Sequence, residues 1–377
     1  MEPEGASRAL VMSDVAARAG VSHQTVSRVV NKHPHVATAT RERVQRAIEE
    51  LGYRPNAAAR ALVTGSTRTI GFVTVNINQY GPAQTLVGLE QAARAAGYSL
   101  SVTVLEDATA GAMRDAVDRF VAQSVDAVVA LGTYDDAAEA LHALDAPVPL
   151  VAVQSGGSHD WPAVGVDQVA GARLATRHLL ELGHRTVHHV TGPADSQEAR
   201  DRIEGWRAEL LAAGAPEPGY LRGNWTPSSG YEAGRQLAAR MRDGDDVTAV
   251  FLANDQMALG LLAAFHDVGL HAPQDVSVVG FDDLPEAPYF SPPLTTVRQD
   301  FAELGRRGVQ LVLARLRGED VAAPEPVAPQ LVVRSTTGPY PVPGSGRPCG
   351  PRVETLYVSA NIDHPGDRTR RRRAEEN

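Results

Sequence analysis

Residues 13–31 of this 377-residue chain follow the pattern of two short helices joined by a glycine turn. The first helix would place its small apolar residues on one face: Val15, Ala16 and Ala19. Gly20 supplies a residue that adopts a left-handed turn at low steric cost, and Ser22 stands where a helix N-cap belongs. The second helix has valines at helical spacing that would face the first: Val26, Val29 and Val30.

The other side chains of the second helix form an outward row of hydrogen-bonding groups: His23, Gln24, Thr25, Ser27 and Arg28. A helix-turn-helix presents such a row to the major groove of DNA, where donors and acceptors meet the edges of bases. An ordinary helical hairpin with a polar outer face would give the same local pattern. Features elsewhere in the chain are needed to distinguish a helix-turn-helix from an ordinary hairpin.

Composition excludes several classes of protein. The single cysteine, Cys349, cannot build an intramolecular disulfide framework and suits a reducing compartment. No apolar run approaches the roughly 18 residues that cross a bilayer. The sequence begins Met-Glu-Pro-Glu-Gly, without the basic-then-apolar order of a signal peptide. We therefore expect a soluble protein of the cytoplasm and not a membrane protein.

The net charge of −9 is divided unevenly along the chain. Residues 8–68 carry ten Lys or Arg and four acidic side chains, a net charge of +6. With Glu2 and Glu4 included, the first 68 residues carry +4 and the remainder −13. A basic end on an acidic body favours DNA binding through that end alone, because the phosphate backbone attracts only the positive part.

From Thr69 onward, short β-branched runs alternate with longer alanine-rich stretches. Typical strand candidates are residues 69–75, 126–131 and 276–281, and typical helix candidates are 114–123 and 200–213. This alternation predicts right-handed βαβ crossovers and parallel sheets covered on both faces. About ten such strands suit two sheets better than one. Residues 339–377 are rich in Pro, Gly and Arg and are expected to be a disordered tail.

Five separated segments resemble the lactose-repressor (LacI) family of transcriptional regulators, and in particular the member that gives the family its name. These segments are residues 21–31, the Tyr53-Arg54-Pro55-Asn56 run, and residues 251–260, 278–283 and 292–301. The resemblance implies a small all-α helix-turn-helix headpiece. It also implies an α/β core of two doubly wound parallel-sheet subdomains, similar to type I periplasmic binding proteins.

The resemblance also divides the chain. It implies a disordered start at 1–10, a headpiece at 11–55, a hinge helix and linker at 56–68, and an effector-binding and dimerisation core at 69–338. Within that core, the N-subdomain would comprise about 69–166 and 297–330, and the C-subdomain about 167–296. The alanine-rich hinge segment is too short to hold a helix alone in water, so it should form only against DNA or a second copy.

The family pattern assigns DNA contacts to particular residues. It puts His23, Gln24 and Arg28 at the positions that contact bases. The guanidinium of Arg28 matches the two acceptors of guanine, and the amide of Gln24 offers a donor and an acceptor that can pair with a base edge. Neighbouring polar side chains would bind phosphates or begin the hinge helix: Ser22, Thr25, Ser27, Asn31 and Asn56. Leu62 would enter the minor groove as a wedge, although packing against the core is an alternative. His23 stands where the namesake has tyrosine, so preference at that base step is open.

The family pattern also places an effector cleft between the core subdomains, lined by Gly81, Pro82, Gln154, Arg202, Trp225, Asn254, Asp282, Gln299 and Phe301. Arg, Asn and Asp side chains bind adjacent sugar hydroxyls, and aromatic rings cover the C–H face of a sugar. Asn254 and Asp282 follow predicted strands, so turn or cap chemistry is their alternative role. Core packing is the alternative for Trp225 and Phe301.

The resemblance implies a repressor of a carbohydrate-utilisation operon, released from a pseudo-palindromic operator by a sugar inducer. Leu131 and Gln154 stand where the namesake has asparagine and aspartate, which points to a sugar related to a galactoside but different from it. The tail lacks the leucine heptads of a tetramer, so a homodimer is expected. A regulator that needs a corepressor such as a purine is the main alternative, and a sugar-transport protein is another. No enzymatic activity, cofactor or metal is expected.

Overall fold

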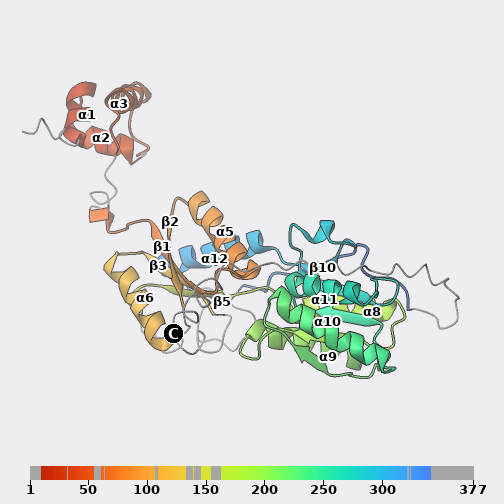
Figure 1. Cartoon of the computed structure of the whole chain (residues 1–377). Coiled ribbons are helices and arrows are strands. Elements are labelled where there is room, and N and C mark those ends of the chain that lie inside the picture. Colours follow the sequence, from red (N-terminus) through yellow and green to blue (C-terminus); the bar gives the residue numbers. More distant parts are fainter. Residues whose placement is uncertain are drawn as a thin grey trace, which may run out of the picture. The chain divides into compact units, whose positions relative to one another are not determined.

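The computed structural model describes residues 10–31, 33–54, 61–62, 64–106, 109–132, 139, 146–153, 163–320, 322 and 324–340 (Figure 1). The predicted site residues Asn56 and Gln154 lie outside the described residues, as do most of the predicted hinge helix and residues 341–377. Ala61 and Leu62 have helical backbone, and the Leu62 side chain is 89% exposed.

The headpiece consists of α1 (Met12–Ala19), α2 (His23–Val30) and α3 (Thr38–Leu51). Gly20 ends α1 in the left-handed conformation at φ 61°, and the Ser22 hydroxyl accepts the Thr25 backbone N–H at 3.2 Å. The three helices enclose a small core of Val15, Ala16, Ala19, Val26, Val29, Val44, Ala47 and Tyr53. The predicted helical pair and its turn are therefore confirmed, and α3 closes the core from the third side.

The N-subdomain contains a five-stranded parallel sheet in the order β2-β1-β3-β4-β5. Its strands are β1 (Thr69–Val75), β2 (Ser99–Leu105), β3 (Ala127–Leu131), β4 (Leu150–Val153) and β5 (Ala163–Val164). Its helices are α5 (Tyr80–Ala95), α6 (Ala110–Ala122) and α12 (Phe301–Leu316). The residues of α5 and α12 join one apolar cluster and those of α6 another, so both faces of the sheet are covered.

The C-subdomain contains a six-stranded sheet in the order β11-β10-β9-β8-β6-β7, and its β10–β11 pair is antiparallel. Its strands are β6 (His188–Thr191), β7 (Tyr220–Arg222), β8 (Ala249–Leu252), β9 (Ser277–Asp282), β10 (Thr295–Arg298) and β11 (Gln330–Val332). Its helices are α8 (Gln168–Glu181), α9 (Gln197–Ala212), α10 (Pro227–Arg242) and α11 (Asp255–Asp267), with a 3-10 turn at Ala287–Tyr289. α8 and α9 pack on one face and α10 and α11 on the other.

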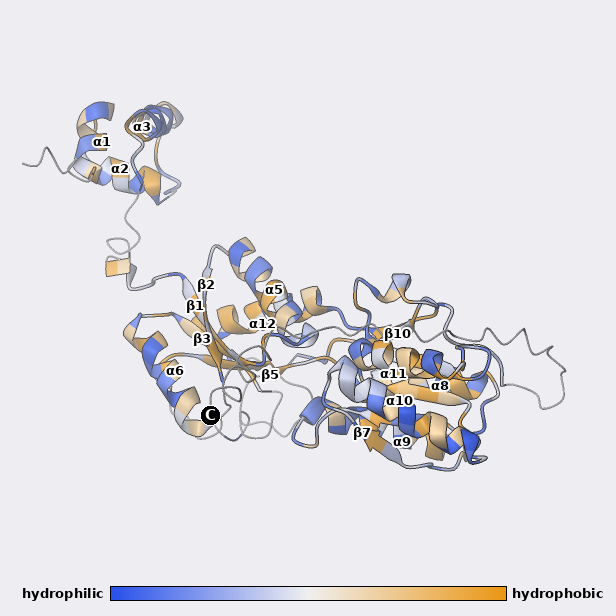
Figure 2. Ribbon diagram, viewed as in Figure 1, coloured by the Kyte–Doolittle hydropathy of each residue, from blue (hydrophilic) through white to orange (hydrophobic). Residues whose placement is uncertain are grey.

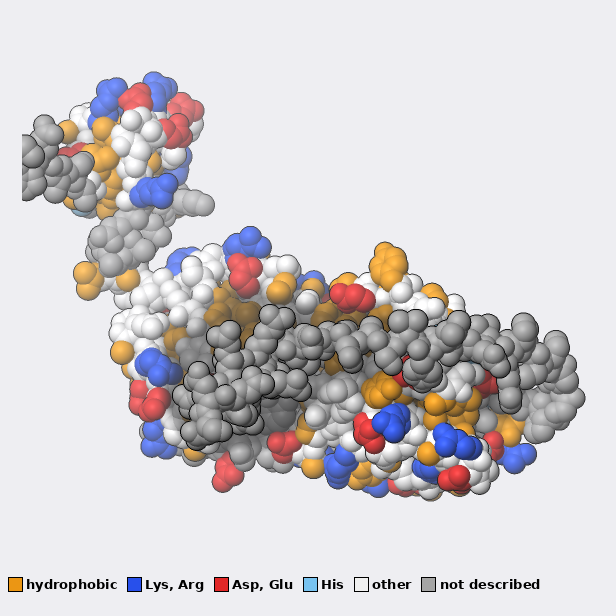
Figure 3. Space-filling view, viewed as in Figure 1, with side chains coloured by type: hydrophobic (Ala, Val, Ile, Leu, Met, Phe, Trp, Pro, Cys, Tyr) orange, Lys and Arg blue, Asp and Glu red, His pale blue; other side chains and the backbone are white. Residues whose placement is uncertain are grey.

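Hydropathy follows this layered arrangement (Figure 2). The central strands β3, β4, β6, β8 and β9 are buried along their whole length. On the face drawn in Figure 3, basic and acidic side chains are interspersed over the C-subdomain and do not gather by sign. Among the described helices, none is both long enough and apolar enough to span a bilayer.

The last elements of the core alternate between the two subdomains. β10 belongs to the C-subdomain sheet, α12 to the N-subdomain and β11 to the C-subdomain sheet again, so the chain crosses between subdomains repeatedly. β10 continues to Arg298, two residues beyond the expected end of this C-subdomain segment at about 296. Short-range hydrophobic periodicity cannot indicate which of two sheets a strand joins. The described order also extends to Tyr340, whose N–H donates to the Leu182 carbonyl at 2.9 Å.

Helices α5 and α12 touch through glycine. A Cβ atom built on Gly305 would lie 2.2 Å from the Gly88 carbonyl carbon, and one on Gly88 would lie 2.2 Å from the Phe301 carbonyl oxygen. Both obstacles are backbone atoms, which cannot move aside like the end of a flexible side chain. Gly111 in α6 is a matched contrast, because nothing lies within 4 Å of its added Cβ.

We therefore predict that Gly305→Ala lowers the free energy of unfolding by about 1–3 kcal/mol, because the added methyl group separates the two helices. Gly111→Ala should be neutral or raise it by up to about 1 kcal/mol, as helix propensity alone would do. Urea unfolding followed by circular dichroism measures both. Equal stability of the two variants would contradict the close packing of α5 on α12.

Candidate functional site

The second helix of the headpiece exposes the side chains predicted to contact bases. His23, Gln24 and Arg28 are exposed, while Val26 and Val29 are buried against the other helices. The residues predicted to bind phosphates surround them: Ser22 and Asn31 are exposed, and Thr25 and Ser27 are half-buried. Ser22 also caps the helix, so its hydroxyl has a structural role in addition to any DNA contact.

A concave surface lies beside this row of side chains. Ser22, Thr25 and Arg28 line it from α2, and Thr40 and Arg43 line it from α3. Sequence analysis did not identify Thr40 and Arg43, although α3 contains the basic run Arg41, Arg43 and Arg46. Two helices therefore contribute basic and hydroxyl side chains to one concavity, a chemistry suited to a phosphate backbone.

One cavity lies between the two subdomains, and elements of both subdomains line it. Its wall includes eight of the nine predicted cleft residues: Gly81, Pro82, Arg202, Trp225, Asn254, Asp282, Gln299 and Phe301. The ninth, Gln154, lies outside the described residues. Gly81 and Pro82 lie in the first turn of α5.

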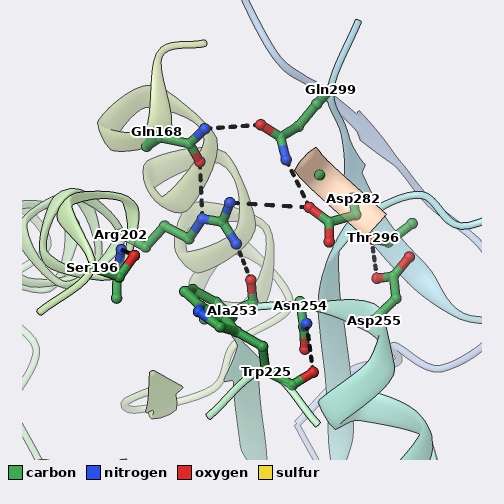
Figure 4. Close-up of polar contacts among 12 residues, drawn as sticks. Gln168, Ser196, Arg202, Trp225, Ala253, Asn254, Asp255, Asp282, Thr296 and Gln299 are labelled. Carbon is green, nitrogen blue, oxygen red and sulfur yellow. Dashed lines mark hydrogen bonds and ion pairs between the residues drawn. The ribbon is translucent and has the colours of Figure 1, made fainter. Parts of the chain in front are cut away.

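A ring of polar contacts runs around the C-subdomain side of this cavity (Figure 4). Arg202 donates from Nε to Gln168 Oε1 at 2.9 Å and from Nη1 to the Ala253 carbonyl. Gln168 Nε2 donates to Gln299 Oε1 at 2.8 Å, and Gln299 Nε2 donates to Asp282 Oδ1 at 2.7 Å. Asp282 lies 4.0 Å from Arg202 Nη2, which completes the ring.

Two aromatic rings flank the Arg202 guanidinium, whose central carbon lies 3.9 Å from the Phe281 ring centroid and 5.4 Å from that of Trp225. Trp225 is only 6% exposed and packs on Gly192, where an added Cβ would lie 2.2 Å from the indole. Trp225 therefore has the packing role that was its alternative, while one edge still lines the cavity. Phe301 is half-buried and packs edge-on against the Tyr80 ring, with the two ring centroids 5.9 Å apart.

Asn254 has the cap chemistry that was its alternative role. Its Oδ1 accepts the Met257 N–H at 2.9 Å at the start of α11, and its Nδ2 donates to the Trp225 carbonyl at 3.0 Å. The amide therefore joins α11 to the loop before α10. Both polar atoms retain a further hydrogen-bonding position, so the cap does not exclude contact with a ligand in the cavity.

Asp282 projects from a constrained backbone at the end of β9. Its φ is 114° and that of Asp283 is 56°, conformations that side-chain-bearing residues rarely adopt. Asp283 is held by Arg298 and Arg334, each at 2.6 Å. Burial raises the pKa of Asp282 to about 7, against the opposing influence of Arg202 and Gln299. Its carboxyl group therefore changes charge near neutral pH.

Three cavity residues were not identified from the sequence. Glu198 in the first turn of α9 lines the cavity, and burial raises the pKa of its carboxyl group. Tyr80 begins α5, and burial together with nearby Asp282 raises the pKa of its phenol to about 12. Gln168 begins α8 and is 2% exposed. The sequence does carry one signal for them, because Asp167 and Ser196 are N-caps directly before two of these helix starts.

Helix starts gather around the cavity. Tyr80, Gln168, Glu198, Asn254 and Phe301 each lie at the amino end of a different helix. This is the edge where parallel strands end and open α/β sheets bind ligands. The partial positive charge of helix amino ends favours anionic and hydrogen-bond-accepting groups there. Among the described residues, no three His, Cys, Asp or Glu side chains are grouped as metal ligands.

We predict a pH signature for Asp282. Its folded pKa of about 7 exceeds its ordinary value of 3.8, so the folded state binds a proton that the unfolded state lacks between these values. This contribution to stability is present at low pH and is lost as pH rises through 7. Asp282→Asn should therefore gain stability relative to the parent between pH 5 and pH 8, by at least about 2 °C in Tm.

Differential scanning fluorimetry across that pH range measures the effect. Asp118→Asn, an exposed change on α6, is the control and should keep a constant difference from the parent. A pH-independent difference for Asp282→Asn would mean that the carboxyl group is already ionised at pH 5.

Comparison with known proteins adds independent evidence. Residues 11–56 match the family described as bacterial regulatory proteins, lacI family, and residues 176–337 match a periplasmic binding protein-like domain. The chain is 35% identical over 329 residues to the lactose operon repressor of Escherichia coli (strain K12), covering 87% of this chain and 91% of that protein. It is 30% identical over 332 residues to the transcriptional repressor PurR of Haemophilus influenzae (strain PittEE), covering 86% and 98%.

Solved structures are similar too. A lac repressor dimer bound to operator and the anti-inducer ONPF matches with a TM-score of 0.77 and 34% identity, over 88% of this chain and all of that one. A complex of the transcriptional regulator CelR with cellobiose matches with a TM-score of 0.63 and 33% identity, over 87% and 99%. With this similarity along most of its length, the chain belongs to the LacI family of bacterial regulatory proteins.

Proposed function

We propose that this chain is a dimeric transcriptional repressor that a sugar inducer releases from a pseudo-palindromic operator. The cavity carries the proposal, because eight residues predicted from sequence line a single space and its polar groups are held ready. Arg202, Gln299 and Asp282 already have fixed partners, so their remaining donors and acceptors are oriented before a ligand binds. Such pre-organisation lowers the entropic cost of binding.

The lining of the cavity suits a sugar. Its C-subdomain side offers carboxyl, amide and guanidinium groups that can pair with adjacent hydroxyls: Gln168, Glu198, Arg202, Asn254 and Asp282. Phe301, Leu131 and Val153 supply apolar surface from the N-subdomain for C–H groups. Leu131, which is 3% exposed, stands where the lac repressor has asparagine. Its hydrocarbon side chain cannot make the hydrogen bonds of that amide, which favours a ligand with one fewer polar contact there than a galactoside.

For the DNA side, we propose that His23, Gln24 and Arg28 contact bases. Ser22, Thr25, Ser27 and Asn31 would hold phosphates together with Arg43, and Leu62 would be a minor-groove wedge. The 89% exposure of Leu62 supports this role, since packing against the core would have buried it. Two copies related by a two-fold axis would bind two half-sites. The repressor dimer bound to operator is the structural relative that supports this arrangement.

Two measurements test the proposal together. Selection from a random-sequence duplex library should yield an inverted repeat, and this duplex then serves as the probe. A thermal-shift panel of mono- and disaccharides, with purine bases included, should yield a sugar that stabilises the protein and weakens binding to the selected duplex. A purine that stabilises the protein and tightens duplex binding would replace the proposal with the corepressor mechanism.

We predict that Arg202→Lys separates the two activities. Lysine keeps the positive charge but cannot reach Gln168 and the Ala253 carbonyl together, so the cavity loses its orientation. Affinity for the sugar found in the panel should fall at least about tenfold, while affinity for the selected duplex stays within about twofold. Isothermal titration calorimetry measures the affinity for the sugar, and fluorescence anisotropy measures the affinity for the duplex. Arg235→Lys, exposed on α10, is the control, and unchanged sugar affinity in Arg202→Lys would exclude Arg202 from the site.

A second prediction concerns DNA specificity. Arg28→Ala should weaken binding to the selected duplex by about 10–100-fold and relax the preference at one base step, because a bidentate base contact is lost. Arg46→Ala, exposed on α3, removes the same charge away from α2 and should weaken selected and random duplexes equally. Anisotropy titrations at several salt concentrations measure both. If both variants changed the ratio of selected-duplex affinity to random-duplex affinity equally, Arg28 would contact phosphate only.

A further inference from the structure

A single carboxylate ties down the segment that leads from the headpiece to the core. Asp126 stands one residue before β3 and accepts hydrogen bonds from three consecutive residues. The Ser66 hydroxyl donates to it at 2.5 Å, the Thr67 N–H at 2.9 Å and the Arg68 N–H at 3.0 Å. These residues are 58 to 60 positions away in the sequence, so the contact is tertiary and not a local turn.

Further bonds surround this carboxylate. The Thr67 hydroxyl donates to the Ser124 carbonyl at 2.8 Å, and the Arg68 carbonyl accepts the Ser99 N–H at 2.8 Å. Arg68 has a φ of 51°, a left-handed conformation that a side-chain-bearing residue holds only when its neighbours enforce it. The carboxylate holds the Arg68 N–H on one side of the bond that φ describes, and the Ser99 N–H holds the Arg68 carbonyl on the other side.

The strand that begins beside Asp126 ends at the cavity. β3 is buried at all five residues and pairs with β1 on one side and β4 on the other, so it is central to the N-subdomain sheet. Its last residue, Leu131, lines the cavity together with Val153 of β4. One short, fully paired strand therefore connects the cavity wall to the attachment point of the linker.

We propose that Asp126 is a positioning residue for DNA binding: it clamps residues 66–68 to the start of β3. The linker then begins at a fixed point of the N-subdomain. The clamp shortens the free tether of each headpiece to the residues before Ser66, which lowers the entropic cost of docking two headpieces on one duplex. The DNA part of this inference rests on the proposed function.

Asp126→Ala tests the clamp, with Asp118→Ala as the charge-matched control on an exposed position of α6. Hydrogen exchange by mass spectrometry on the full chain should find at least about tenfold faster exchange in peptides covering residues 64–68 of Asp126→Ala. Peptides from α12 and the C-subdomain should be unchanged. Affinity for the selected duplex should fall about tenfold, and affinity for a random duplex should stay within about twofold, since a longer tether weakens only simultaneous docking. Asp118→Ala should match the parent throughout.

Each contrary outcome would overturn one part of the proposal. Unchanged exchange at 64–68 would mean that the carboxylate does not hold the linker, and this measurement needs no DNA. Faster exchange with unchanged affinity for the selected duplex would mean that the clamp does not position the headpieces. Equal weakening on both duplexes would mean that the clamp does not act by favouring simultaneous docking of two headpieces. A parent protein that selects no duplex would refute the proposed function, while the exchange result would still decide the clamp.

Discussion

The buried guanidinium of Arg202 is the group on which the cavity depends. It is 3% exposed, and a charge in that position is tolerated only with partners in good geometry. Those partners come from the start of α8, the end of β8 and the end of β9, and Gln299 extends the ring to the segment before α12. The ends of separate elements are therefore held in register around one side chain.

Carboxyl groups outnumber guanidinium groups around that centre. Burial raises the pKa values of Glu198, Asp255 and Asp282. Arg202 opposes the rise at Glu198, and Arg202 and the hydrogen bond from Gln299 oppose it at Asp282. Asp255 accepts the Thr296 hydroxyl at 2.5 Å and the Leu284 N–H at 2.9 Å, and so supports the loop that carries Asp282. The cavity is thus polar without being uniformly charged, which suits ligands whose polar groups are neutral.

Much of this could be predicted because the relevant patterns are local. Gly20, Ser22 and the three valines of α2 lie within eleven residues, and each plays the expected part. The start of each core helix was harder to predict, because polar first turns such as Gln197-Glu198 lack apolar periodicity. That turn forms part of the cavity wall, so the missed start of α9 and the missed residue Glu198 have one cause.

The sequence by itself determined the helix-turn-helix and the alternation of strands and helices, while the cavity residues followed from the resemblance to a known family. Propensity, capping and burial pattern act over a few neighbours, so a single chain displays them directly. Only the tertiary structure decided that β10 and β11 pair in one sheet, and that Asp126 meets residues 66–68. These contacts join positions far apart in the chain, and nothing in the local pattern of either segment specifies its partner.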